Sequence, residues 1–140
     1  MARPVPFVFP FEVRYLEVDQ QGVVFNMWYL AYFDDAWTAF LEQGGLPYAE
    51  MLADGYDVQL VHTELDWHAP LGFGEPAEVR VGLAGVGRSS VTVQFEVWSD
   101  GRRVASGTTV YVVVPLGGEG TMAVSDRLRD ALGPPSPLRP

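Results

Sequence analysis

Residues 27–43 constrain the fold most strongly. They contain no glycine or proline and are followed directly by Gly44 and Gly45, a pattern that predicts one long helix. At helical spacing its polar side chains fall within an arc of roughly 100°; they are Asp34, Asp35, Thr38 and Glu42. Almost every other side chain of the segment is apolar. A helix with so narrow a polar stripe must be enclosed on most sides by the rest of the chain.

Segments with strand character supply the enclosure. They are residues 7–18, 57–68, 76–86, 89–98 and 103–114, separated by glycine-rich turns. Shorter helices are predicted near residues 47–53 and 126–132. We therefore predict an α+β fold with a five-stranded antiparallel sheet wrapped around one long buried helix. Residues 1–140 should form a single domain with its core at about residues 7–132, and the proline-rich ends should be loose.

The composition excludes several classes of protein. There is no cysteine, which rules out disulfides, thiolate metal sites and cysteine nucleophiles. The two histidines, His62 and His68, have no zinc-binding spacing, so we expect no metal. A net charge of −9 without a basic block is unsuited to nucleic-acid binding. No apolar stretch has the length of a signal peptide or a membrane helix, so we expect a cytoplasmic protein without membrane insertion.

The link between the first strand and the long helix contains the informative motif. Residues 13–30 read VRYLEVDQQGVVFNMWYL. This segment resembles the signature of the 4-hydroxybenzoyl-CoA thioesterase family, hotdog-fold acyl-CoA thioesterases that include the Tol-Pal-associated group. The matching positions are Arg14, Tyr15, Glu17, Asp19, Gly22, Val23, Val24, Phe25, Tyr29 and Leu30. The order of predicted strands and helices also matches the hotdog fold.

The resemblance implies an enzyme that hydrolyses an acyl-CoA thioester to free acid and CoA. It implies that Asp19 is the catalytic carboxylate, either as nucleophile or as general base on water. By the same resemblance the backbone N–H of Asn26 polarises the thioester carbonyl, in a position where many members have histidine. No cofactor is implied, because coenzyme A is part of the substrate. The acyl group, and CoA versus acyl carrier protein as its carrier, stay open.

Elementary chemistry agrees with this interpretation. Gly22 permits a turn that other residues resist. The chain then enters a helix N-terminus, where unpaired N–H groups and the helix dipole stabilise a developing oxyanion. Without the resemblance, Asp19 is an ordinary turn or N-cap residue. We expect Arg14 and Glu17 to be an exposed strand pair, and Tyr15 and Tyr29 to belong to the core.

Two further groups of residues are candidates for binding. Arg88, Ser89 and Ser90 resemble the family's turn that faces the phosphates of coenzyme A; an exposed hairpin is the alternative. His62, Glu64, Asp66 and His68 alternate along one strand and fit a pocket, a metal site, a wet surface or an interface equally well. Asp34 and Asp35 are expected to contact solvent.

Two other functions fit the same fold. One is a non-catalytic acyl-binding protein, and the other is a hydratase, which the absence of histidine before residue 62 opposes. We also expect a homodimer or homotetramer, because exposed sheet edges invite pairing. The segment 89–98 is regular and free of proline, which makes it the expected edge. The resemblance implies that Asp19 of one chain faces Arg88 or Ser89 of its partner.

Overall fold

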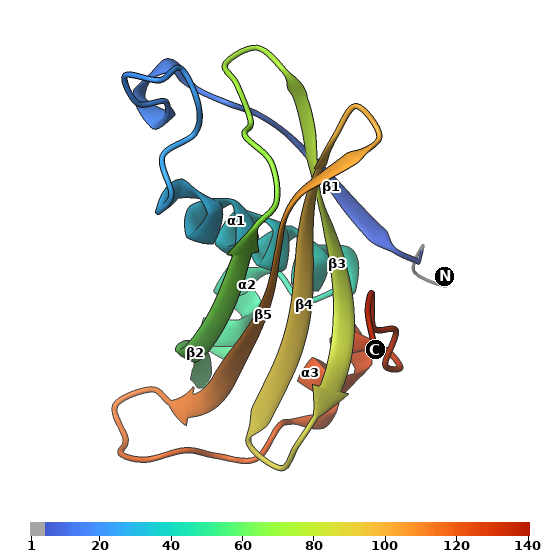
Figure 1. Ribbon diagram of the computed structural model, residues 1–140. Helices are drawn as coiled ribbons and strands as arrows, with labels where there is room; N and C mark the ends of the chain where they lie inside the picture. Colours follow the sequence, from blue (N-terminus) through green and yellow to red (C-terminus); the bar gives the residue numbers. More distant parts are fainter. Residues whose placement is uncertain (1–4) are drawn as a thin grey trace.

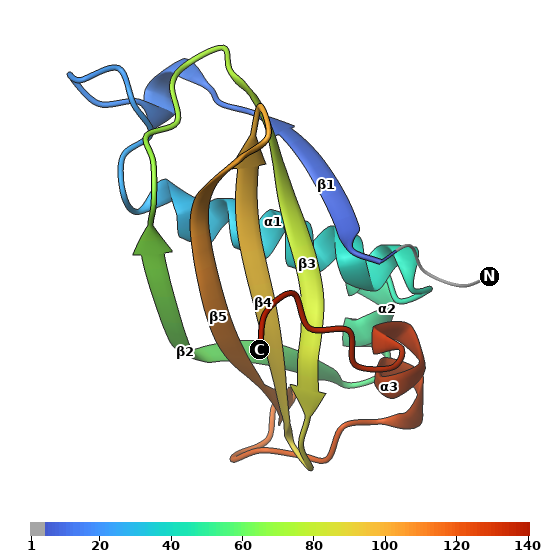
Figure 2. The ribbon, with the colours of Figure 1, turned by 45° about the vertical axis from the view of Figure 1, so that its right-hand side comes forward.

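The computed structural model describes residues 5–140. Five strands form one antiparallel sheet in the order β1-β3-β4-β5-β2, and the long helix α1 crosses one of its faces (Figures 1 and 2). The strands are β1 (Phe7–Glu12), β2 (Tyr56–Trp67), β3 (Pro76–Val86), β4 (Ser90–Ser99) and β5 (Arg102–Pro115). The helices are α1 (Trp28–Gln43), α2 (Tyr48–Ala53) and α3 (Asp126–Leu132). The predicted α+β fold is confirmed.

The core lies between α1 and the sheet. Phe33 stacks on Phe95 of β4 with ring centroids 4.8 Å apart, and Trp37 stacks on Tyr111 of β5 at 4.6 Å. The alternate β4 residues Val91, Val93, Phe95 and Val97 are all fully buried, as period-two patterning predicts. All four residues of the polar stripe of α1 are exposed. The helix is therefore enclosed on most sides, and its polar stripe faces outward.

Two predictions about the strands are wrong. The first strand ends at Glu12, and a single 3-10 turn, Tyr15–Glu17, follows it. The segment predicted as an edge, which corresponds to β4, is the central strand, and the edges are β1 and β2. A regular apolar strand without proline suits the centre of a sheet as well as an edge, because the pattern reports burial on a face and not the identity of the neighbours.

The loops gather at two ends of the sheet. Residues 13–27, the β2–β3 loop and the β4–β5 hairpin lie at one end, and the β3–β4 hairpin lies at the opposite end (Figure 1). At the first end an isolated bridge joins Val23 to Gly72. The amide of Val24 also donates a hydrogen bond of 2.8 Å to the carbonyl of Leu71, whose side chain is fully buried. The β2–β3 loop therefore supports the segment that leads into α1.

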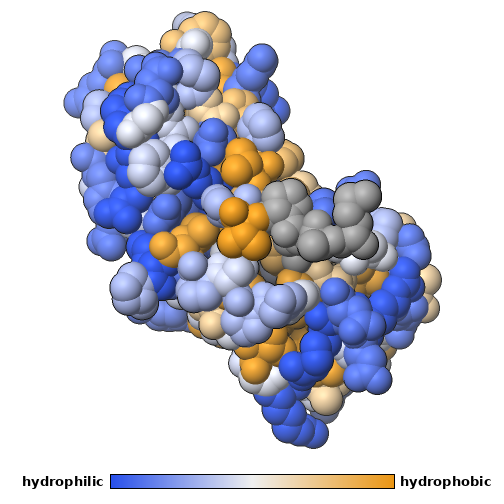
Figure 3. Space-filling view, turned by 90° about the vertical axis from the view of Figure 1, so that its right-hand side faces the viewer, coloured by the Kyte–Doolittle hydropathy of each residue, from blue (hydrophilic) through white to orange (hydrophobic). Residues whose placement is uncertain are grey.

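The C-terminal tail is bound to the sheet, contrary to the expectation that it is loose. It crosses the outer faces of β3 and β4, on the side away from α1 (Figure 2). Gln94 Oε1 accepts the amides of Leu138 and Arg139, and Arg139 also bonds Glu96 at 2.8 Å. The corresponding expectation for the N-terminal end concerns residues 1–4, which lie outside the described residues. Seen from the side where the tail lies, apolar residues form small groups among polar ones (Figure 3).

Candidate active site

The segment between β1 and α1 folds into a tight hairpin that presents Asp19. The amide of Asp19 donates to the carbonyl of Val23, and the amide of Gly22 donates to the carbonyl of Asp19, both at 2.9 Å. Gly22 has a φ of 76°, in the left-handed region that favours glycine. Further down, the amide of Phe25 donates to the carbonyl of Glu17 at 2.9 Å. The turn expected around Gly22 is therefore present.

The Asp19 carboxylate is partly exposed at the tip of this hairpin. Its Oδ1 accepts a hydrogen bond of 2.8 Å from the amide of Gln21, which fixes the side chain in an Asx turn. The carboxylate lines a concave surface together with two aromatic residues, Tyr15 and Phe73, whose rings meet edge to face at 6.2 Å. A substrate that enters this concavity would meet a fixed acceptor oxygen flanked by apolar surface.

The helix start lies directly after the hairpin. The amide of Trp28 bonds the carbonyl of Phe25, and that of Leu30 bonds the carbonyl of Met27. Within residues 5–140 no hydrogen bond uses the backbone N–H of Asn26, and no side chain caps the helix at Met27. The sixteen residues of α1 add their aligned dipoles at this point. The start of α1 thus offers donor capacity next to the Asp19 hairpin.

Glu17 contradicts the expectation of an exposed strand pair. Its side chain is buried, with 2% of the residue exposed, and it accepts hydrogen bonds from Arg14 and from Tyr32 of α1. The three-residue spacing of Arg14 and Glu17 indicates a helical turn for this pair, because residues three apart lie on opposite faces of a strand but on one side of a helical turn. Tyr15 was expected in the core and is 81% exposed, whereas Tyr29 is buried as expected.

The candidate coenzyme-binding turn lies at the other end of the molecule. Arg88 is exposed at the β3–β4 hairpin, and Ser89 and Ser90 are partly buried. The hairpin is closed by the amide of Gly87, which donates to the carbonyl of Ser90 at 2.8 Å. Within one chain the sheet separates this turn from Asp19 (Figure 1). The structure therefore brings Asp19, Gly22 and Asn26 together, and places Arg88, Ser89 and Ser90 elsewhere.

The polar residues of β2 lie on the outer face of the sheet. His62, Glu64 and Asp66 pair with β5 residues that alternate with Thr109, which is buried on the α1 side. His62 and Glu64 are 3.2 Å apart and exposed, and His68 lies 2.7 Å from the Ser106 hydroxyl. Among residues 5–140 no group of three or more histidine, cysteine or acidic side chains is arranged to hold a metal ion.

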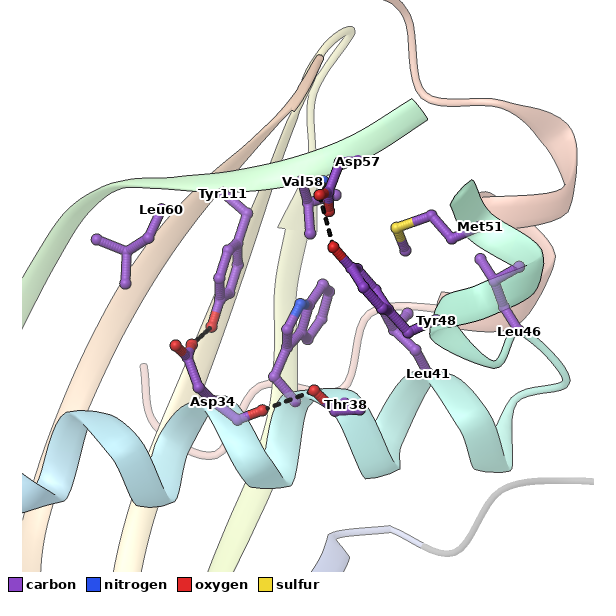
Figure 4. Close-up of a pocket in the computed structure, with 11 residues that line it drawn as sticks. Asp34, Thr38, Leu41, Leu46, Tyr48, Met51, Asp57, Val58, Leu60 and Tyr111 are labelled. Carbon is purple, nitrogen blue, oxygen red and sulfur yellow. Dashed lines mark hydrogen bonds between the residues drawn. The ribbon is translucent and has the colours of Figure 1, made fainter. Parts of the chain in front are cut away.

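A second cavity, of about 230 Å³, opens between α1, α2 and β2 (Figure 4). The Asp34 carboxylate accepts a hydrogen bond of 3.1 Å from the Tyr111 hydroxyl, so it does more than contact solvent. Across the cavity, Tyr48 donates to Asp57 at 2.7 Å. The remaining lining is mainly apolar and includes Trp37. Burial raises the pKa of Asp34, the nearby Asp35 charge adds to the rise, and the Tyr111 bond opposes it.

Comparisons with known proteins agree on one family. Residues 13–132 match the family model described as "Thioesterase-like superfamily". A protein of Aquifex aeolicus named "Putative esterase" is 30% identical over 81% of this chain and 88% of its own length. A 1,4-dihydroxy-2-naphthoyl-CoA hydrolase of Synechococcus elongatus is 24% identical over 86% of this chain and 90% of its own.

Solved structures share the fold of this chain. The crystal structure of a hypothetical protein from Thermus thermophilus is 34% identical to this chain, covers 89% of it and 95% of the other chain, and superposes with a TM-score of 0.84. The expected hotdog fold and the resemblance are both confirmed, the latter at the level of the superfamily. In the described part of the chain, no helix combines the length and the apolar character needed to cross a membrane.

Proposed function

The chain belongs to the thioesterase-like superfamily, and from this premise we propose that it hydrolyses acyl-CoA thioesters to a free acid and CoA. The observation that carries the proposal is the juxtaposition of a fixed carboxylate, Asp19, with the start of a long helix whose Asn26 amide has no partner in the described residues. Names of relatives such as the naphthoyl-CoA hydrolase point to the same reaction. We also propose that residues 1–140 form one catalytic domain.

The roles follow from the chemistry of thioester hydrolysis. The thioester carbonyl would bind at the Asn26 N–H, where the helix dipole stabilises the negative charge that develops on oxygen. Asp19 would either attack the carbonyl carbon itself or accept a proton from an attacking water. In both routes the C–S bond breaks, coenzyme A leaves as the thiol, and water supplies the oxygen and protons of the products. Gly22 contributes the backbone geometry that presents Asp19.

Coenzyme A would bind across two chains. Arg88, Ser89 and Ser90 lie too far along the sheet to meet Asp19 of their own chain (Figure 1). β1 carries Pro10, which disfavours edge pairing, whereas the twelve-residue β2 has no proline. A twofold axis that pairs two β2 edges reverses the strand direction. It would bring the Asp19 end of one chain beside the Arg88 end of its partner, in a homodimer or within a homotetramer.

Release of free thiol from a panel of acyl-CoA substrates tests the proposal. Asp19→Asn should lower turnover by at least about two orders of magnitude, the usual contribution of a group with a direct chemical role. Asp130→Asn, which changes an exposed carboxylate on α3, is the matched control and should keep normal turnover. Binding without hydrolysis by the wild-type chain would instead identify a non-catalytic acyl-binding protein. A folded Asp19→Asn variant with more than roughly a tenth of wild-type turnover would exclude the carboxylate from the chemistry.

A further inference from the structure

Glu17 is a buried carboxylate that the roles above do not use. The residue is 2% exposed, although acidic residues are rarely buried unless they are paired. Its Oε1 accepts from the Arg14 amide at 2.9 Å and from the Tyr32 hydroxyl at 2.8 Å, and its Oε2 accepts from Arg14 Nε at 2.7 Å. Both oxygens are therefore satisfied by directed donors.

These donors come from two different elements. Arg14 is the N-cap residue of the 3-10 turn that contains Glu17, and its guanidinium also lies 5.9 Å from the ring centre of Trp28 in α1. Tyr32 lies in the second turn of α1, is buried, and packs on Phe11 of β1 with ring centroids 4.2 Å apart. The Glu17 carboxylate thus ties the segment before the hairpin to α1.

In the pair of Glu17 and Tyr32, the carboxylate carries the charge and the phenol keeps its proton. Burial alone would raise the pKa of Glu17, but the hydrogen bonds from Arg14 and Tyr32 outweigh it and hold this pKa below its usual value. Burial and the contact with Glu17 raise the pKa of the Tyr32 phenol. Near neutral pH the carboxylate is therefore ionised and the phenol remains a donor.

Glu17 also stands at the base of the Asp19 hairpin. Its carbonyl accepts the amide of Phe25, and a bridge between Val18 and Val24 continues the pairing toward the tip. Asp19 is two residues away on one arm, and Asn26 directly follows the other. The hydrogen bond that Tyr32 donates to Glu17 consequently fixes both arms of the hairpin relative to α1, the helix whose start supplies the carbonyl-binding amide.

We propose that Glu17, bonded to Tyr32, is a positioning residue that holds Asp19 in register with the N-terminus of α1. The proposal rests on the proposed function for its catalytic consequence. A displacement of a reacting group by about 1 Å costs as much as 100-fold in rate. Loss of the anchor should therefore reduce turnover rather than substrate affinity, even though Glu17 touches no substrate.

The test compares Glu17→Gln and Tyr32→Phe with a matched control, Glu96→Gln. Glu96 is another buried carboxylate paired with arginine, but it lies on β4 and bonds Arg139 on the outer face of the sheet. We expect kcat to fall about 10- to 100-fold in Glu17→Gln and several-fold in Tyr32→Phe, with KM changed less than about twofold. The shape of the pH–rate profile should stay that of the wild type. Glu96→Gln should lower the denaturation midpoint and leave kcat unchanged.

Three outcomes would overturn the proposal: unchanged kcat in folded Glu17→Gln, an equal loss of kcat in Glu96→Gln, or a change confined to KM. Amide hydrogen exchange distinguishes failure of the positioning role of Glu17 from failure of the proposed function. If the wild-type chain releases no thiol from any acyl-CoA, the anchoring role is retained when Glu17→Gln, unlike Glu96→Gln, speeds exchange at the amides of Asp19 and Gly22. It is lost when both variants leave that exchange unchanged.

Discussion

The Tyr111 hydroxyl donates a hydrogen bond of 3.1 Å to the Asp34 carboxylate, linking β5 to α1 at the wall of the second cavity (Figure 4). Burial raises the pKa of both groups, and the Asp34 charge raises that of Tyr111 further. The phenol therefore stays protonated near neutral pH and continues to donate. The cost falls on Asp34, because the residue is exposed as a whole but also lines the cavity, where its carboxylate is partly desolvated.

Asp34→Asn should remove a pH dependence of stability. A folded-state pKa raised above the unfolded value means that this group stabilises the fold fully below the unfolded pKa, and that the stabilisation is lost as pH rises through the folded pKa. The variant should match or exceed the wild type near pH 7 and lose that advantage toward about pH 4, as denaturation titrations would measure. A difference that is constant over this range would contradict the prediction.

Trp37→Ala should destabilise the protein by about 3–5 kcal/mol, the usual loss for a buried large aromatic side chain. Trp37 is 4% exposed and stacks on both Tyr111 and Phe40. The exposed Glu42 of the same helix provides the control, and Glu42→Ala should change the unfolding free energy by no more than about 0.5 kcal/mol. Chemical denaturation gives both values, and a Trp37→Ala midpoint equal to the wild type would show that this face of α1 is not enclosed.

Gly82→Ala should disturb the C-terminal tail. A Cβ at Gly82 would lie 2.6 Å from the carbonyl oxygen of Ser136 and 2.8 Å from Leu138 Cγ, closer than real contacts allow. We expect a loss of about 1–3 kcal/mol, typical of overpacking, by chemical denaturation. The same substitution in a chain that ends at Gly133 should cost almost nothing, because the clash is absent. An equal cost in both chains would place the strain in the sheet and not in the tail.

Local patterns in the sequence predict much of the fold. Apolar alternation in β4 and the narrow polar stripe of α1 are direct consequences of burial, so they predict the sheet and the enclosed helix. The order of strands depends on which edges meet in space, and no local pattern contains it. The bound tail was missed for the same reason, since proline-rich composition says nothing of the Gln94 and Glu96 side chains that receive it.

In the candidate site, too, local sequence predicts some features, whereas others depend on residues that meet only in the folded chain. The turn at Gly22 and the helix start at residue 28 follow from local sequence, and they place Asp19. The burial of Glu17 depends on Tyr32, a partner fifteen residues away that lies beside it only after α1 docks. The separation of Arg88 from Asp19 also appears only in three dimensions.

Arg88→Ala should raise KM for acyl-CoA several-fold and change little with a truncated thioester that lacks the nucleotide. A remote contact that stabilises substrate and transition state equally acts on KM and not on kcat. Arg80→Ala, which removes a cation paired with Glu78 on β3, is the control and should leave KM unchanged. Steady-state kinetics on both substrates measure the effect, and equal losses on the two would remove Arg88 from the coenzyme A site.

The active protein should contain at least two chains, each completing the site of the other. A sedimentation mass near 15.4 kDa in a fully active sample would refute this. The stronger test mixes Asp19→Ala with Arg88→Ala subunits at a substrate concentration well below KM. In a mixed dimer one site carries both defects and the other carries none, so random exchange should restore about a quarter of wild-type activity. If each site used both residues of one chain, the mixture would show only the mean of its two parents, even with exchange proven by mass spectrometry. That mean would exclude a shared site, whereas a gain above it requires that Asp19 and Arg88 act across the interface.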